Sequence, residues 1–242
     1  MSELAMDFTN EGGAGTYPSR ADIETPNWVR DLYARDTTDL HEERLSAVVA
    51  YLQSTGARSV LDLGCGEGDL LLRLLSETQV DRIVGIDISN SSLMAAQRAF
   101  DKLPMKVAGR VELRCLSFTE PNPALAGFEA AVLLETIEHI EPRHLGRVEE
   151  AVFRSYGPGH LMVTTPNQEY NVLHGMRPGA MRHPDHRFEW DRARFRRWAR
   201  AVASRHGYSV RFGDIGPFDV DLGASTQSAM FERLDSTERN RN

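Results

Sequence analysis

The stretch Leu61-Asp62-Leu63-Gly64-Cys65-Gly66-Glu67-Gly68 decides the fold. It joins a short apolar run, 59–63, to a leucine-rich segment, 69–76, through a turn that contains three glycines. The apolar run predicts a buried strand, and the leucine-rich segment predicts a helix. Glycines between them let the backbone approach a bound ligand closely. The sequence therefore predicts a strand, a ligand-binding turn and a helix.

Strand-like and helix-like segments alternate along the rest of the chain. Apolar runs predict strands at 82–87, 111–116, 128–134 and 161–165, and short late strands at 208–212 and 229–231. Apolar spacing predicts helices at 40–52, 89–100 and 145–154, and a fourth helix that begins after Asp191. Asp39 can cap the start of the first helix and Gly56 can end it, and Asp191 can cap the last. This alternation favours an α/β fold with a doubly wound, mostly parallel sheet and helices on both faces. Ligands bind such sheets at the carboxyl ends of the strands.

The composition of the 242-residue chain suits a single domain over residues 21–235, in which 22–35 is helical or irregular. The first twenty residues are polar and glycine-rich, which predicts a disordered or loosely held N-terminus, and 236–242 form a polar tail. There is no apolar run of membrane-spanning length and no signal-like start, so we expect a cytoplasmic protein without a membrane partner. The cysteines, Cys65 and Cys115, predict neither a disulfide framework nor a cysteine-rich zinc site.

The charge is unevenly distributed. A net charge of −7 argues weakly against broad binding to nucleic acid. Between residues 182 and 211, however, arginines greatly outnumber acids. This pattern fits either a solvated helix face or a local positive patch on an acidic protein.

The acids around the glycine turn narrow the choice of ligand. A dinucleotide-binding turn has its third glycine where this chain has Asp69. Asp62, just before the glycines, would repel a pyrophosphate but suits a cationic amine such as that of S-adenosylmethionine. Asp87 ends the next strand, about where an acid meets ribose hydroxyls in dinucleotide-binding folds.

The sequence LDLGCGEG followed by GIDIS resembles motifs I and II of class I methyltransferases, which have a Rossmann-like fold. That resemblance implies that Asp62, Gly64 and Gly66 hold the methionyl end of S-adenosylmethionine. It also implies that Asp87 binds the ribose hydroxyls and that Ser117 lies near the adenine. The alternatives are a tight strand-to-helix connection, ordinary capping acids and a turn serine.

A cluster of metal-binding residue types follows the predicted strand 128–134. Glu135, Glu138 and His139 are spaced so that, if the chain turns helical, all three project from one face. Two carboxylates and an imidazole suit a divalent cation. Taken singly, each would be an ordinary surface acid or a structural histidine.

The segment 182–190 can supply a fourth ligand, for which His183 and His186 compete. Two carboxylates and two imidazoles would leave two octahedral positions open. The 2′- and 3′-hydroxyls of a terminal ribose would fill two adjacent positions. Metal coordination lowers the pKa of such a hydroxyl, and a nearby histidine can take its proton.

The motifs after the fourth and fifth predicted strands resemble one known family. E-x-x-E-H at 135–139, T-T-P-N-x-E-Y-N at 164–171 and R-H-x-D-H-x-F-E-W at 182–190 are similar to the HEN-type small-RNA 3′-terminal ribose 2′-O-methyltransferases. An x-F-x-x-W-A helix follows, and the similarity runs in order from about residue 40 to 231. It implies S-adenosylmethionine, magnesium or manganese, and methylation of the 2′-hydroxyl at an RNA 3′ end.

The resemblance also implies roles for individual residues. The metal ligands and catalytic residues are Glu135, Glu138, His139 and His186, and we expect His139 to act as the general base as well. Other side chains are candidates for contacts with the RNA: Arg182, Arg187 and Arg192 for phosphates, Trp190 for base stacking, and Asn167 and Tyr170 for the RNA channel. The alternatives are solvated arginines, a core tryptophan, a turn cap and a packed aromatic ring.

Two departures from the family pattern bear on function. Asp191 stands where the family usually has threonine. Bacterial members often carry a further N-terminal half that works with an RNA end-healing partner. We expect this chain to be either a lone methyltransferase or the methyltransferase fragment of a longer protein. The resemblance implies a role in RNA repair or in RNA-mediated gene silencing. Two other functions compete: methylation of a catechol-like small molecule, and binding of RNA ends without catalysis.

Overall fold

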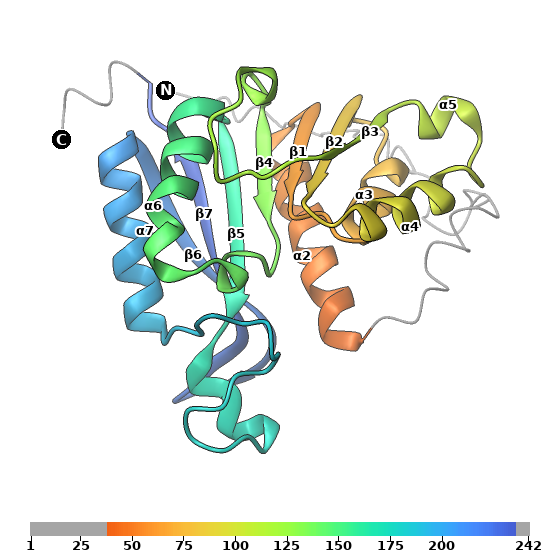
Figure 1. Ribbon diagram of the computed structural model, residues 1–242. Helices are drawn as coiled ribbons and strands as arrows, with labels where there is room; N and C mark the ends of the chain where they lie inside the picture. Colours follow the sequence, from red (N-terminus) through yellow and green to blue (C-terminus); the bar gives the residue numbers. More distant parts are fainter. Residues whose placement is uncertain (1–37, 236–242) are drawn as a thin grey trace, which may run out of the picture. The chain divides into compact units, whose positions relative to one another are not determined.

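A computed structural model describes residues 38–235 of the chain as a single seven-stranded sheet flanked by helices (Figure 1). The predictions for residues 1–20, 22–35 and 236–242 lie outside the described residues. The strand order is β3-β2-β1-β4-β5-β7-β6. Five strands are parallel, namely β1 (Ser59–Leu63), β2 (Arg82–Asp87), β3 (Val111–Cys115), β4 (Ala130–Leu133) and β5 (His160–Pro166). The predicted α/β fold with a mostly parallel sheet is confirmed.

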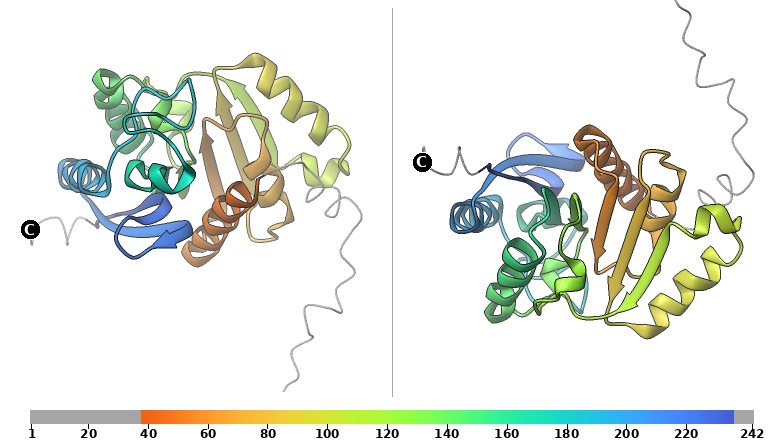
Figure 2. Two further views of the ribbon diagram at one scale, coloured as in Figure 1. Left: turned by 90° about the horizontal axis from the view of Figure 1, so that it is seen from below. Right: turned by 90° about the horizontal axis from the view of Figure 1, so that it is seen from above.

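Helices lie on both sides of this sheet (Figure 2). They are α2 (Asp39–Thr55), α3 (Asp69–Ser76), α4 (Asn90–Phe100), α5 (Met105–Ala108), α6 (Leu145–Val148), which continues as the π-helix η4 (Glu149–Tyr156), and α7 (Arg192–His206). Short 3-10 turns are η1 (Pro123–Leu125), η2 (Ile137–His139), η3 (Pro142–His144) and η5 (Gln168–His174). The main core packs α6, η4 and α7 against one face of the sheet. On the other face α3 lies so close to β2 that a Cβ on Gly85 would be 2.5 Å from Leu71 Cδ1.

The last two strands are longer than the sequence suggests. β6 (Tyr208–Asp219) and β7 (Gly223–Arg233) form an antiparallel hairpin, and β7 also pairs with β5. The predicted strands 208–212 and 229–231 cover only part of them. The reason is that β7 buries a polar run, 225–228, whose side chains hide the strand pattern.

One smaller difference concerns the first described helix. Thr38, not Asp39, caps α2, because its Oγ1 accepts a hydrogen bond from the His41 amide at 3.2 Å. Asp39 is the first helical residue, and Gly56 ends the helix in the left-handed conformation as predicted. Among the described residues, no helix is both long and apolar enough to cross a membrane.

Candidate active site

The glycine turn after β1 forms one wall of a cavity of about 560 Å³, here called the donor cavity. Gly64 has φ +90°, and a Cβ there would lie 2.6 Å from Thr136 Cγ2, so only glycine fits. The amides of Gly64 and Cys65 donate to Ile86 O at 2.8 and 2.9 Å. The turn is therefore fixed against the ends of β2 and β4 before any ligand arrives.

The carboxylate of Asp87 lies in the same wall. Its Oδ2 accepts from the Gly66 amide at 2.9 Å and its Oδ1 from the Ser89 amide at 2.8 Å. Two backbone donors hold the carboxylate in one orientation. The full lining consists of Gly64, Asp87, Ile88, Ser92, Ser117, Phe118, Thr119, Glu135, Thr136, His139, Ile140 and Asp185.

Asp62 occupies a different environment from the one expected of a ligand-binding acid. It is 2% exposed and is absent from the described lining of the donor cavity. Burial, with smaller contributions from Asp87 and Asp69, raises the pKa of Asp62 to about 7. A cation brought close to the turn would restore the charged form.

The segments after β4 and β5 enclose a second cavity of about 620 Å³, the acceptor cavity. Its described lining is Leu40, Arg44, Glu135, Glu138, His139, Pro166, His174, Met176, Arg182, His183 and His186. All four predicted ligands and the competing His183 thus face one space. Glu135 and His139 line the donor cavity as well, so the two cavities meet at these residues.

The acidic cluster after β4 is not the single helix face that its spacing predicted. Glu135 has φ +49°, unusual for a residue with a side chain, and only one 3-10 turn, η2, follows it. The hydroxyl of Thr164 on β5 stabilises this conformation, since it accepts from the Glu135 amide at 3.0 Å and donates to Glu135 Oε1 at 2.8 Å. The three side chains line one cavity because the backbone turns sharply, not because they follow a helix.

Glu138 carries an incompletely satisfied carboxylate. It is fully buried, and its Oε2 accepts from Thr165 Oγ1 at 3.0 Å. Its Oε1 has no partner within residues 38–235. Burial, reinforced by the charge of Glu135, raises the pKa of Glu138 well above its ordinary value. A buried oxygen of this kind is costly alone and well suited to a divalent cation, so the donor set fits a metal.

Glu135 is partly neutralised by Arg44, an arginine that no local sequence pattern marks. Arg44 of α2 forms a 2.7 Å ion pair with Glu135 Oε2, and its Nε donates to Thr226 Oγ1 at 2.8 Å. Burial raises the pKa of Glu135, and Arg44 opposes that shift. Arg44 lies beside the buried Leu45 in an ordinary amphipathic pattern, which carries no local sign of a role in the site.

Three imidazoles gather at the acceptor cavity. Nitrogen atoms of His139, His183 and His186 all lie within 4.8 Å of one another. Burial is the main cause that lowers the pKa of His139, and the charge of His186 adds to it. A lowered pKa favours the neutral ring that a ligand or a general base requires.

Hydrogen bonds distinguish the two competing histidines. His186 Nδ1 lies 2.6 Å from Glu189 Oε1, and a carboxylate oxygen can only accept a hydrogen bond. The proton of the neutral ring therefore lies on Nδ1, and Nε2 keeps a free lone pair. His183 Nδ1 instead accepts from the Asp185 amide at 3.2 Å, which places the proton of the neutral ring on Nε2. His186 therefore presents a ligand atom and His183 a hydrogen-bond donor. Sequence reasoning did not identify Glu189, whose role depends on a contact three residues away.

The three predicted phosphate-binding arginines differ in their freedom. Arg182 lines the acceptor cavity, but its guanidinium donates to Asn171 Oδ1, Ser225 Oγ and Asn167 O at 2.6, 3.0 and 2.7 Å. Arg192 forms a 2.8 Å ion pair with Glu169. Arg187 is exposed, with a looser 3.6 Å contact to Glu141. Arg187 is the most open of the three to an incoming phosphate.

For Trp190, Asn167 and Tyr170 the structure bears out the alternatives to RNA contact: a core ring, a turn cap and a packed aromatic ring. Trp190 is 4% exposed and stacks on Phe188 with ring centroids 4.3 Å apart, so a base cannot reach its ring. Asn167 is fully buried, and its Nδ2 donates to two carbonyls that precede and begin β7. Tyr170 is also buried. These side chains shape the loop behind the acceptor cavity.

Comparison with known proteins agrees with this geometry. The family described as a methyltransferase domain matches residues 60–159. A crystal structure of the methyltransferase domain of bacterial CtHen1-C is 41% identical, with a TM-score of 0.74, and the match covers 81% of this chain and 100% of that one. A crystal structure of the small RNA methyltransferase HEN1 is 31% identical with the same TM-score, covering 84% of this chain and 26% of that one.

A curated relative is the small RNA 2′-O-methyltransferase of Gallus gallus. It is 33% identical over 206 residues, which cover 81% of this chain and 54% of the relative. The corresponding protein of Xenopus tropicalis is also 33% identical, with 80% and 55% covered. The chain therefore spans about half the length of these two relatives.

Proposed function

Because this chain belongs to the Hen1 family, whose bacterial methyltransferase domain it matches over that domain's whole length, we propose that it transfers a methyl group from S-adenosylmethionine to the 2′-hydroxyl of the 3′-terminal nucleotide of RNA. The observation that carries the proposal is the meeting of two cavities at Glu135 and His139. One cavity suits a nucleoside with a cationic group, and the other suits a cation and a diol. A reacting oxygen and a methyl group would meet at their junction.

In the donor cavity, Asp87 binds the ribose hydroxyls of S-adenosylmethionine. Its two backbone hydrogen bonds leave further lone pairs on each oxygen for those hydroxyls. Ser117 lines the same cavity and lies near the adenine. Gly64 and Gly66 let the methionyl end approach the backbone, and Asp62 beneath them favours the positive charge of its amine.

In the acceptor cavity, Glu135, Glu138, His139 and His186 would hold one divalent cation, magnesium or manganese. The partnerless Oε1 of Glu138 and the free Nε2 of His186 support this assignment. When bound, the cation supplies two adjacent positions for a vicinal diol and lowers the pKa of its hydroxyls. Glu189 keeps His186 in the tautomer that a ligand needs.

The residues of the chain perform the remaining steps. A neutral His139 ring whose lone pair is not held by the cation takes the proton of the 2′-hydroxyl; the 2′-oxygen then forms a bond to the methyl carbon while the bond from that carbon to sulfur breaks. The products are the 2′-O-methyl ribose and S-adenosylhomocysteine. Arg187 is exposed and directly follows His186 in the chain. It contacts the phosphate on the 5′ side of the terminal nucleotide. A cytoplasmic location and an RNA end-healing partner stay predictions.

The test compares three ends of one RNA. The protein is incubated with labelled S-adenosylmethionine, manganese and a single-stranded RNA that ends in a free diol, in a 2′-deoxyribose or in a 3′-phosphate. We expect label only on the free diol, in a product that resists periodate. Equal labelling of all three would contradict terminal-diol chemistry, and labelling of a catechol in place of RNA would favour a small-molecule enzyme.

A further inference from the structure

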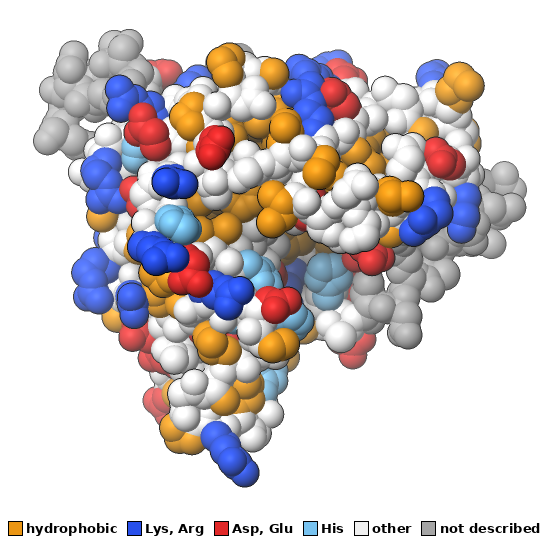
Figure 3. Space-filling view, in the orientation of Figure 1, with side chains coloured by type: hydrophobic (Ala, Val, Ile, Leu, Met, Phe, Trp, Pro, Cys, Tyr) orange, Lys and Arg blue, Asp and Glu red, His pale blue; other side chains and the backbone are white. Residues whose placement is uncertain are grey.

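The outer face of α7 is the most basic described surface that the proposed chemistry does not use. Over 192–206 the helix carries arginines and no acid, on a chain whose net charge is −7. Arg194, Arg196, Arg197 and Arg200 are exposed. Figure 3 shows Lys and Arg side chains gathered over the region that α7 occupies in Figure 1, on the same side of the molecule as the hollow with several His side chains.

The guanidinium groups on this face keep their hydrogen-bonding edges free. Arg196 and Arg200 lie over the Phe212 ring at 5.5 and 5.3 Å, and Arg194 lies over Trp190 at 5.2 Å. A guanidinium close to the face of an aromatic ring is attracted to it, which favours one position of the side chain. None of these arginines forms an ion pair with an acid of residues 38–235. Ordered guanidinium groups without acidic partners suit phosphate groups.

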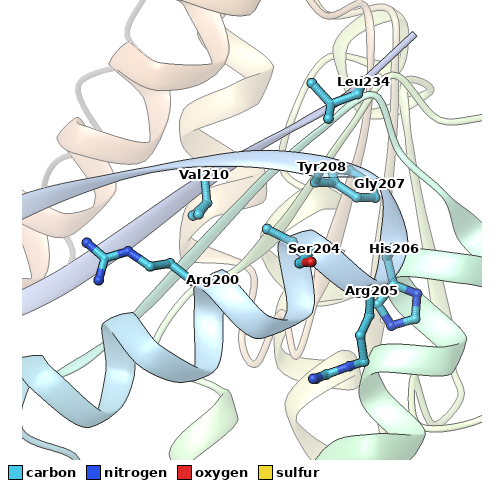
Figure 4. Close-up of a pocket in the computed structure, with 9 residues that line it drawn as sticks. Arg200, Ser204, Arg205, His206, Gly207, Tyr208, Val210 and Leu234 are labelled. Carbon is cyan, nitrogen blue, oxygen red and sulfur yellow. The ribbon is translucent and has the colours of Figure 1, made fainter. Parts of the chain in front are cut away.

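The arginines at the two ends of α7 set the limits of this face. Arg192 is paired with Glu169 at 2.8 Å. At the other end lies a cavity of about 700 Å³ lined by Arg200, Arg205 and His206 (Figure 4), where Arg205 forms a 2.5 Å ion pair with Glu149. Since both end arginines are neutralised within the fold, the free positive charge is confined to 194–200.

This face begins next to the acceptor cavity. Asp191 caps α7 only five residues after His186, and the exposed Arg187 lies between them in the chain. From Arg194 to Arg200 the helix rises by about 9 Å, which corresponds to roughly three phosphates of a stacked strand at about 3.4 Å each. A strand whose 3′ end lies among the histidines can therefore continue along the helix.

We propose that Arg194, Arg196, Arg197 and Arg200 bind the sugar–phosphate backbone of the RNA upstream of its 3′ end. This inference rests on the proposed function and adds to it a surface that recognises RNA length but not sequence. The face favours longer RNA over a dinucleotide, because only the longer chain reaches the arginines.

The test replaces three of these arginines together, as Arg194→Gln, Arg197→Gln and Arg200→Gln. A matched control removes the same charge from another exposed surface, as Arg98→Gln, Lys102→Gln and Lys106→Gln. For each protein, KM for methylation and Kd from fluorescence anisotropy are measured with a dinucleotide and with a longer RNA, at two salt concentrations. Melting temperature and S-adenosylmethionine affinity report on folding.

We expect the α7 variant to raise KM and Kd for the longer RNA by about 10- to 100-fold and to leave the dinucleotide within about twofold. The affinity of the α7 variant for the longer RNA should depend less on salt. The slope of log affinity against log salt concentration should be smaller in magnitude by about two. An Arg→Lys version should retain part of the affinity, because it keeps the charge but loses the planar guanidinium groups over the aromatic rings. Unchanged binding of the longer RNA, an equal loss in the control, or an equal loss for the dinucleotide would each overturn the proposal. If the wild-type protein methylates neither RNA, the proposed function fails, and Kd still decides whether α7 binds RNA.

Discussion

The donor and acceptor cavities lie at the same edge of one sheet but are built differently. Backbone forms the donor cavity: the tight turn at Gly64 and the two amides that hold Asp87 are complete without a ligand. Charged side chains form the acceptor cavity, and they are incompletely paired, as the orphan Oε1 of Glu138 shows. The comparison indicates that the donor site is preorganised by folding, whereas the acceptor site is completed by what binds there.

This contrast separates the effects of substitutions. Changes at Glu138 and His186 should abolish chemistry and leave donor binding intact, since neither belongs to the described lining of the donor cavity. Changes in the donor turn should weaken donor binding and leave metal binding intact. Glu135 and His139, which line both cavities, are the exceptions.

The largest expected effect follows from Glu138→Gln. The isosteric amide keeps an acceptor for Thr165 but cannot neutralise a cation, so we expect kcat to fall by at least about 10³-fold. Affinity for S-adenosylmethionine, measured by calorimetry, should stay within about twofold. The exposed Glu43→Gln is the control. Loss of donor binding in the Glu138 variant would show that the cavities are not independent.

The reciprocal change is Asp87→Asn. The amide NH2 would face either the Gly66 or the Ser89 amide, and two donors in contact repel each other. We expect Kd for S-adenosylmethionine to rise by about 100-fold. Affinity for Mn²⁺, followed by electron paramagnetic resonance, should not change. A parallel fall in Mn²⁺ affinity would contradict the separation of the two sites.

The two histidines sharpen the description of the acceptor cavity. His186→Asn should weaken Mn²⁺ binding by about 10- to 100-fold, and Glu189→Gln by a similar factor, because Glu189 fixes the tautomer of His186. His183→Asn should change Mn²⁺ affinity by less than about threefold, since its neutral ring carries the proton on Nε2. Titration of each variant with Mn²⁺ checks the order. If His183→Asn had the larger effect, the tautomer assignment would be wrong.

The smallest expected effect concerns pH and Asp62. Its pKa of about 7 means that the free protein protonates this side chain as the pH falls through 7. The cationic donor favours the carboxylate, so its affinity should fall by about tenfold from pH 8 to pH 6. Asp62→Asn should bind weakly at both pH values.

The same shift affects stability. An acid whose pKa is raised by folding binds its proton more tightly in the native state, so stability falls as the pH rises from about 4 to 7. Asp62→Asn should therefore raise the melting temperature more at pH 7.5 than at pH 5. An equal change at both pH values would argue against the raised pKa of Asp62.

The sequence predicted the donor half closely, because glycines and strand ends act locally. The turn at Gly64, the strand that ends at Asp87 and the helix after it all have the predicted limits within a residue. The residues of the acceptor half were predicted from residue type and family pattern. The predicted backbone conformation, a helix face through 135–139, was wrong. A left-handed Glu135 depends on Thr164 of a neighbouring strand, which spacing along one segment cannot reveal.

Long-range pairing explains the remaining differences. Arg44 reaches Glu135 across 91 positions of the chain, and the choice between His183 and His186 depends on which backbone or carboxylate each ring meets. Trp190 was a candidate for base stacking or for the core, and packing against Phe188 buries it. Exposed aromatics and core aromatics have the same local pattern, so only the fold separates them.

Binding of Mn²⁺ in the presence of RNA ends tests the diol arrangement most directly. The protein is titrated with Mn²⁺, with S-adenosylhomocysteine in the donor cavity, alone and with RNA that ends in a 2′,3′-diol or in a 2′-deoxyribose. If the acceptor cavity presents both terminal hydroxyls on the cation, the diol RNA alone should tighten Mn²⁺ binding and displace water from its coordination shell. Identical Mn²⁺ affinity and hydration with both RNAs would contradict that arrangement.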